Sequence, residues 1–309
     1  MSRPRYWGHP AAIASATVMA LTSASPAVRA QSTTEAAAET AAEPMAQTVA
    51  QAMPSSTVRA PDSVVVAPPV AAGDGEVRSL ELTMGAQRLT AGLGNWREVA
   101  LRGAYGIGPH LLQGEVSQHR RFNTDGTFLG LSDTYTFNED WFGSVAIGVG
   151  DGAFFLPRWR ADATLYRKLL ADRRLVTSVG VGYYDAPDGH TDKSLSLGAA
   201  YYFEAPWVLE GGVRLNHSNP GGVRTQQQFV ALTYGRDKQD LVTARYGWGS
   251  EGYLAIAANT QLVNFKSHEA SLSWRHWFNP RTGALVALNR YTNPSYRRSG
   301  ITVGVFHAF

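Results

Sequence analysis

The sequence contains no cysteine, which excludes both a disulfide framework and a lipid anchor on an N-terminal cysteine. It also has no run of about eighteen apolar residues, the length that a transmembrane helix needs. The eight histidines are scattered, and no glycine-rich loop opens a helix, so the patterns of metal and nucleotide sites are missing. We therefore expect no metal, no cofactor and no catalytic residues of these kinds.

The sequence also lacks a large excess of charge of either sign. The formal net charge of +3 comes from Arg3, Arg5 and Arg29, so the chain after residue 30 is neutral overall. Acidic residues prevail in residues 31–76, and basic residues prevail slightly in the remainder. Because this excess is mild for so long a chain, we expect no nucleic-acid partner.

The first 76 residues have two parts. Residues 1–30 have a positive start, a short apolar core and a small-residue cleavage site that ends at Ala30, the pattern of a signal peptide. Residues 31–76 are rich in Ala, Thr, Glu and Pro and contain no aromatic residue. Such a segment cannot bury enough apolar surface to offset its ordering entropy. We predict cleavage near Ala30, followed by a disordered periplasmic linker.

Residues 77–309 are dominated by glycine, aromatic residues and a period-two alternation of apolar and polar residues. Trp141, Val145 and Ile147, for example, alternate with small residues along one strand. We predict an all-β fold, an antiparallel transmembrane β-barrel of about fourteen strands, with twelve or sixteen as alternatives. The uncertain segment is 249–267, which could add a hairpin. The mean hydropathy of −0.19 fits a barrel, since only every second residue faces lipid.

The last ten residues predict a closing strand. Val303, Val305 and Phe309 share one face, and the terminal aromatic residue resembles the signal that assembles outer-membrane barrels. An even strand count returns both ends of the barrel to the periplasm, with short turns there and longer loops outside. We expect a monomer in the bacterial outer membrane. Its expected partners are the barrel assembly machinery, outer-membrane lipid and lipopolysaccharide.

The opposite face of the strands carries charges, which suits a polar lumen rather than the apolar filling of a soluble barrel. The candidate lumen-lining residues are Arg102, Glu115, Arg160, Asp162, Glu210, Arg214 and Arg275. Two interpretations are open for the arginines. They could line a pore that favours anions, or they could pair with Glu and Asp and stiffen the lumen.

Two short motifs invite an enzymatic interpretation. Asn216-His217-Ser218-Asn219 is superficially similar to the signature of barrel lipid hydrolases, but adjacent residues of a strand point to opposite faces. Asp188-Gly189-His190 has the spacing of an acid–base pair, and we expect it in a solvated loop. The sequence therefore makes an enzyme the lesser alternative.

Several glycine and aromatic motifs follow one another in a characteristic order. They are Asp133-Thr134-Tyr135, Phe155-Leu156-Pro157-Arg158, Leu165-Tyr166-Arg167, Ser178-Val179-Gly180-Val181-Gly182-Tyr183-Tyr184 and Arg245-Tyr246-Gly247-Trp248-Gly249. In order and spacing, the region from Trp96 onward resembles the YaiO-type outer-membrane β-barrel proteins. The resemblance implies a fold and a location, and it brings no catalytic residues.

The leading functional hypothesis is a porin-like channel or solute-binding barrel for small solutes, saccharides or anions among them. The first alternative is a structural or envelope-assembly barrel with a closed lumen. The second is a surface lipid hydrolase that uses His217 and Ser218.

Overall fold

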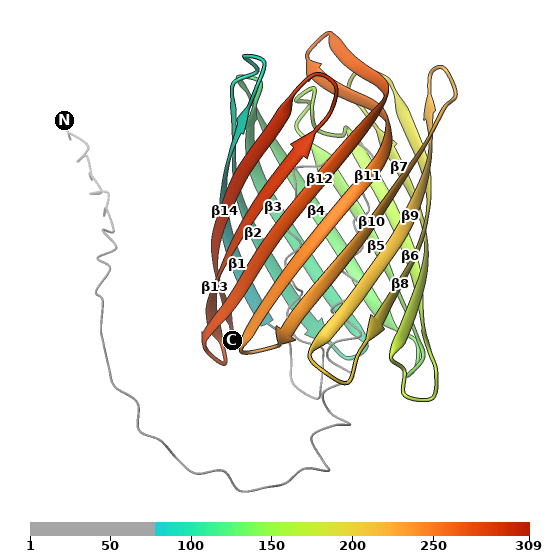
Figure 1. Cartoon of the computed structure of the whole chain (residues 1–309), viewed down its shortest axis with the longest axis vertical. Coiled ribbons are helices and arrows are strands. Elements are labelled where there is room, and N and C mark those ends of the chain that lie inside the picture. Colours follow the sequence, from blue (N-terminus) through green and yellow to red (C-terminus); the bar gives the residue numbers. More distant parts are fainter. Residues whose placement is uncertain (1–77) are drawn as a thin grey trace, which may run out of the picture.

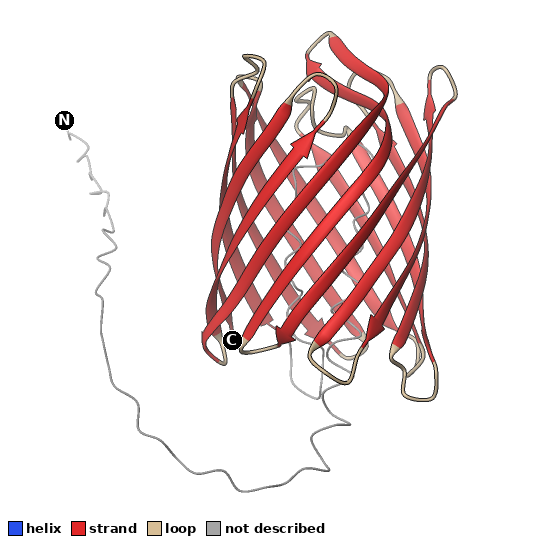
Figure 2. Ribbon diagram, in the orientation of Figure 1, coloured by secondary structure: helices blue, strands red, loops and turns tan. Residues whose placement is uncertain are grey.

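A computed structural model describes residues 78–309, so the predicted signal peptide and linker lie outside the described residues. The chain forms fourteen antiparallel strands that close into one barrel (Figure 1). The strands are Arg78–Leu89 (β1), Asn95–Ile107 (β2), His110–Arg121 (β3), Thr124–Thr136 (β4), Trp141–Gly150 (β5), Trp159–Leu169 (β6), Leu175–Asp185 (β7), Thr191–Tyr202 (β8), Trp207–Asn219 (β9), Val223–Arg236 (β10), Asp240–Ala257 (β11), Thr260–Asn279 (β12), Thr282–Thr292 (β13) and Arg297–Ala308 (β14). This part of the chain has strands and loops only (Figure 2), and no helix in it is long and apolar enough to cross a membrane.

The first and last strands close the barrel. β1 pairs with β14 in a register that sets Leu82 opposite Val305 and Met84 opposite Val303. All strand edges are thereby paired, which removes the exposed edge of an open sheet. Val305 and Phe309 are 56% and 62% exposed, on the outer face that the alternation predicts. The fourteen-strand fold is confirmed, and the role of Val303, Val305 and Phe309 in assembly stays a prediction.

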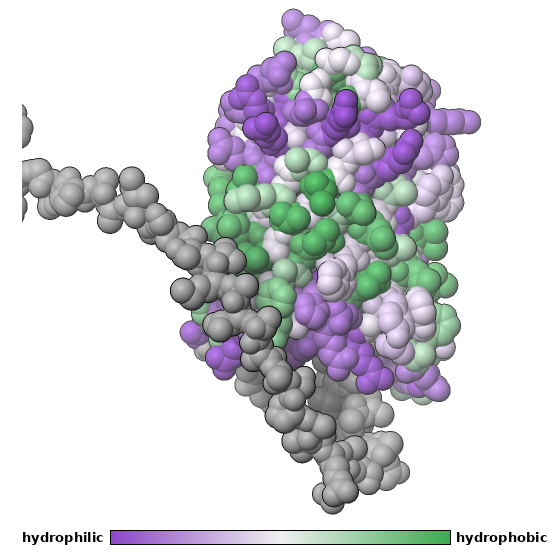
Figure 3. Space-filling model, turned by 60° about the vertical axis from the view of Figure 1, so that its left-hand side comes forward, coloured by the Kyte–Doolittle hydropathy of each residue, from purple (hydrophilic) through white to green (hydrophobic). Residues whose placement is uncertain are grey.

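The outer face of the wall is apolar at mid-height. Exposed leucine, valine and isoleucine side chains project outward from the strands, and Figure 3 shows them as a hydrophobic band bordered on both sides by hydrophilic residues. On β5, Val145 and Ile147 are 59% and 61% exposed. An apolar belt of this kind belongs in lipid and not in water.

Both ends of the described chain lie at one end of the barrel, which we call the terminal end (Figure 1). Its turns are short. In the turn between β4 and β5, the Asn138 side chain accepts backbone hydrogen bonds of 2.9 Å from Asp140 and Trp141, as in an Asx turn. Arg173 donates to Asp140 at 2.9 Å and also to Glu139. These hydrogen bonds raise the pKa of the guanidinium and join neighbouring turns.

The other end, which we call the distal end, has the longest loop, residues 151–158. The other distal connections, such as 186–190, 220–222 and 293–296, are as short as the turns of the terminal end. The predicted difference in loop length therefore holds for the loop 151–158 alone. The alternative of an additional pair of strands at 249–267 is not realised, because β11 and β12 run through this segment and extend the wall as a hairpin. At Gly249, φ is +144° and a Cβ would lie 2.3 Å from the Gln226 carbonyl oxygen. Only glycine therefore fits where this extension begins.

The distal extension of β11 and β12 packs inward instead of projecting into solvent. Leu254 and Phe265 join a buried cluster with Tyr291 and Tyr296, which lie on the same side of the seam between β14 and β1, and with Trp96 of β2 on the other side of that seam. The loop 151–158 also folds inward, since Phe154 lies 5.9 Å from Phe122 between ring centroids. Aromatic contacts therefore surround the distal mouth of the barrel.

Candidate functional site in the barrel interior

The inner face of the wall carries the residues that could form a functional site. All seven candidate lumen residues lie on the face opposite the lipid-facing side chains, and none is highly exposed. Arg102, Glu115 and Arg275 come together in one network, and Arg160, Asp162 and Arg214 lie near one another in a second group. Glu210 is buried on β9 and belongs to neither.

The first group, which we call the Glu81 network, consists of Glu81, Arg102, Glu115 and Arg275. Arg102 Nε donates to Glu115 Oε2 at 2.8 Å, and its Nη1 lies 3.7 Å from Glu81 Oε1. Arg275 Nη1 donates to Glu81 Oε2 at 2.7 Å. Two arginines and two carboxylates therefore alternate along the inner wall, and each charge has a partner of opposite sign.

Aromatic rings and further polar groups hold the Glu81 network in place. The Arg275 guanidinium carbon lies 3.6 Å from the centroid of Phe306, a cation–π contact. On the other side, Ser117 donates to Glu115 at 2.8 Å, and His119 Nε2 is 2.9 Å from the Ser117 hydroxyl. Ser117 and His119 were not predicted as site residues, because a serine and a histidine on an alternating strand carry no signal of their partners.

The second group, which we call the Arg214 group, consists of Arg160, Asp162, Ser194 and Arg214 around Gly182. Arg160 Nη2 donates to Asp162 Oδ2 at 2.7 Å, two residues along β6. Arg214 Nη2 donates to the Ser194 hydroxyl at 2.6 Å. A Cβ at residue 182 would lie 2.7 Å from both Asp162 Oδ1 and Ser194 Oγ, so this glycine leaves the space in which the polar side chains meet.

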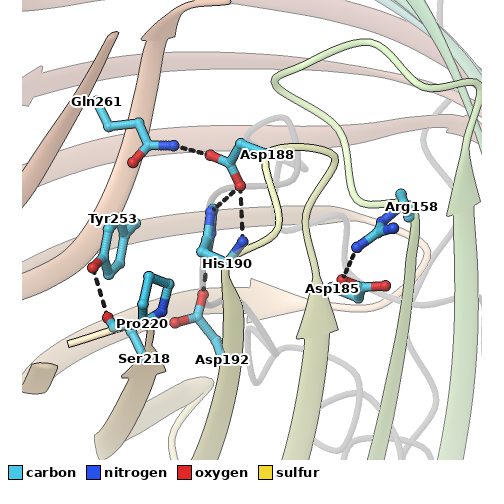
Figure 4. A network of polar contacts seen from close by, with 9 residues as sticks. All are labelled: Arg158, Asp185, Asp188, His190, Asp192, Ser218, Pro220, Tyr253 and Gln261. Carbon is cyan, nitrogen blue, oxygen red and sulfur yellow. Dashed lines mark hydrogen bonds and ion pairs between the residues drawn. The ribbon is translucent and has the colours of Figure 1, made fainter. Parts of the chain in front are cut away.

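A third polar cluster, the His190 cluster, lies at the distal mouth and is formed by Asp188, His190, Asp192 and Ser218 (Figure 4). His190 Nδ1 is 2.5 Å from Asp188 Oδ1, and its Nε2 is 3.8 Å from Asp192 Oδ2. The Ser218 hydroxyl donates to Asp192. The expectation of a solvated loop is wrong, because the side chain of His190 is only 4% exposed.

The extension of β11 and β12 accounts for this burial. The Tyr253 ring stacks on His190 with centroids 5.0 Å apart, and its hydroxyl donates to the Pro220 carbonyl at 2.7 Å. Gln261, beside the tip of the extension, donates to Asp188 (Figure 4). The extension thus reaches across β9 and β10 to the loop 186–190.

The geometry does not form the pair that a lipid hydrolase would need. Ser218 is fully buried on the inner face and donates to Asp192. His217 lies on the outer face of β9, opposite Lys193 and Arg224 of the neighbouring strands. A nucleophile needs its base within hydrogen-bond reach, and these two side chains point in opposite directions. Among residues 78–309 there is also no group of three or more His, Cys, Asp or Glu that could hold a metal ion.

Comparison with known proteins gives a family match and structures of similar fold. Residues 77–254 match the family model described as the YaiO membrane beta barrel domain. A search of curated proteins gave no match.

Solved structures with a similar fold include the TodX deltaS2S3 mutant monoaromatic hydrocarbon channel. It has a TM-score of 0.52 and 10% identity, and the alignment covers 84% of this chain and 98% of that one. The toluene transporter TodX of P. putida gives 0.47 and 10%, with 77% and 90% covered. An anion-selective porin from Comamonas acidovorans gives 0.42 and 11%, with 76% and 99% covered. At such low identity the likeness is one of fold alone.

Proposed function

The chain belongs to the YaiO membrane β-barrel family, and on this premise we propose that this outer-membrane barrel provides a passage for small polar solutes. The observation that carries the proposal is the charged inner wall, with the Glu81 network on one side and the Arg214 group on the other. Charges are costly in an apolar interior, whereas a wetted lumen accommodates them. Larger membrane barrels combine such a polar lumen with an apolar outer belt.

The pairing of the charges supports uncharged solutes over ions. Arg102, Arg160 and Arg275 each bond a carboxylate, so little net positive charge is left to attract anions. Arg102, Glu115 and Arg160 keep about a fifth of their side chains exposed, so they can still offer hydrogen-bond donors and acceptors to a passing solute. Small saccharides, which carry hydroxyl groups and no charge, fit such a lining. An apolar hydrocarbon would gain nothing from it.

Liposome swelling tests this function. The full chain, refolded into liposomes, should admit small saccharides and exclude larger ones. Ser194→Trp adds a large side chain to the inner wall beside Arg214 and should slow saccharide entry severalfold. Leu195→Trp adds the same side chain to the 41% exposed outer face and should leave the rate unchanged. A folded barrel that admits no saccharide, or equal effects of the two substitutions, would contradict the proposal.

The distal mouth favours a second candidate, a closed barrel with a structural role in the envelope. The β11–β12 extension bonds the loop 186–190 through Gln261 and Asp188, and the aromatic residues of the loop 151–158 fold inward. The swelling assay separates the two functions. A closed barrel should remain impermeable even after Gln261→Ala, whereas a channel should conduct with or without this hydrogen bond.

A further inference from the structure

The distal rim of the outer wall carries a group of basic side chains on neighbouring strands. We call it the basic patch, and it consists of Lys266 on β12, Arg290 on β13, Arg297 on β14, Arg88 on β1, and Arg97 on β2. All five are exposed. β12, β13, β14, β1 and β2 follow one another around the barrel. The patch is therefore continuous across the seam where the sheet closes.

The register places these cations close together. Arg88 and Arg290 both pair with Ser299, from the two sides of β14. Arg97 lies directly opposite Arg120 of β3. Like charges directly opposite each other destabilise an antiparallel pair, so the arrangement favours an anion between them.

The protein itself supplies few counter-charges here. Arg120 bonds Asp125 at 2.9 Å. Within the described part of the chain, no carboxylate forms an ion pair with Arg88, Arg97, Arg290 or Arg297. At the terminal end, Arg173 bonds two acids and Arg167 lies over the Trp141 ring at 5.0 Å. Arg236 and Arg281 stand there on β10 and in the turn after β12, so the exposed arginines of this end are not on adjacent strands. Outward cations without an ion pair thus gather on adjacent strands at the distal rim.

The height of the patch matches that of lipid headgroups. On the same outer face, Leu288 precedes Arg290 and Val99 follows Arg97, and both are exposed apolar residues of the lipid-facing band. Two residues of a strand span about 7 Å. The guanidinium groups therefore lie just beyond the apolar band.

We propose that the basic patch binds the phosphate groups of lipopolysaccharide in the outer leaflet. An arginine fork matches two phosphate oxygens at once. Several cations on adjacent strands can contact the two phosphates of one lipid A headgroup. The proposal does not depend on whether the lumen conducts.

Binding of lipid A to the full-length protein in zwitterionic detergent tests the patch. The probes are bisphosphorylated lipid A, the same lipid A without phosphates, and inorganic phosphate. The triple variant Arg97→Gln, Arg290→Gln, Arg297→Gln removes three patch charges. The matched control Arg167→Gln, Arg236→Gln, Arg281→Gln removes three exposed arginines near the terminal end. Heat-shift electrophoresis verifies that both variants are folded.

The patch variant should bind bisphosphorylated lipid A about 100-fold more weakly, as loss of three cations at a charged headgroup implies, and the control should bind like the native protein. Removing the phosphates from the lipid should weaken binding to a similar extent. Equal losses in both variants, or none in either, would overturn the proposal. So would inorganic phosphate that displaces the lipid at a concentration equal to that of the lipid, because it would indicate a site for the free anion.

Discussion

At the scale of single residues, Arg275 connects strands that are not neighbours in the wall. It stands on β12 and bonds Glu81 on β1, 194 positions away in the sequence, past β13 and β14. Both side chains are about nine-tenths buried. A buried charge that loses its partner is costly, so this pair tests how strongly the inner wall depends on its ion pairs.

Arg275→Met should lower the free energy of unfolding by about 3 kcal/mol, because Glu81 keeps its charge and loses its nearest partner. Adding Glu81→Gln should restore most of that loss, since neither charge then remains. Urea titration of the folded barrel in detergent measures both values. If the double variant were less stable than Arg275→Met, the pairing would not explain the loss.

Gly182 is a second residue whose substitution should change the stability of the barrel. Gly182→Ala should destabilise the barrel by about 1–3 kcal/mol, since the new methyl group must push Asp162 or Ser194 aside. Gly114→Ala is the matched control, because nothing lies within 4 Å of its Cβ. The same urea titration compares them. Equal effects at the two positions would show that the space beside Gly182 is not needed.

Sequence reasoning at this scale could assign a face to each residue but not its partners. The period-two alternation sets Arg102, Arg160 and Arg275 on the face opposite the exposed apolar residues. It contains no information on pairs between strands that are not neighbours in the wall, such as Arg275 with Glu81. Those depend on closure and on stagger between strands, which only the complete register determines.

At the scale of elements, the extension of β11 and β12 has the clearest functional consequence. Its Tyr253 and Gln261 contact the His190 cluster and the Pro220 carbonyl across the distal mouth. Hydrogen bonds of this kind contribute only about 1 kcal/mol each. The buried cluster of Leu254 and Phe265 holds the extension on the β13–β2 side, and these polar contacts tie it to the loop 186–190 on the other side.

Gln261→Ala should shift the extension toward an open position by about fivefold, the change that corresponds to one such hydrogen bond. Single-channel recordings should then show a larger fraction of time in the higher conductance state. Thr260→Ala, at the tip of the same hairpin, should leave the recordings unchanged. An unchanged open fraction in Gln261→Ala would contradict a gating role for the contact with Asp188.

Some strands are easier to predict from the sequence than others, for physical reasons. Strands with an exposed outer face and short turns have a clear alternation, so their number and order are confirmed. The segment 249–267 was ambiguous because the distal part of β11 and β12 packs inward, where Leu254 and Phe265 are buried and no lipid-facing pattern is required. The burial of His190 escaped prediction for the same reason, since Tyr253 is distant in the sequence.

At the scale of the whole molecule, the barrel combines an apolar outer belt, a charged inner wall and a basic distal rim. The belt follows from the sequence alternation, and it fits a membrane barrel of the family to which the chain belongs. The inner wall supports the proposal of solute passage, and the distal rim supports the separate proposal of lipopolysaccharide binding. A variant of the basic patch should therefore leave saccharide entry into liposomes unaffected.

The most direct test of the central claim is the single-channel conductance of the full-length barrel in a planar bilayer, after heat-shift electrophoresis has verified folding. We predict steady ohmic steps with weak charge selectivity, because most inner-wall arginines are paired. Neutralising Arg160 or Arg214 should shift the selectivity toward cations. A folded barrel that passes no current, in the native form and with Gln261→Ala, would contradict an open polar lumen and would leave the closed structural barrel as the function.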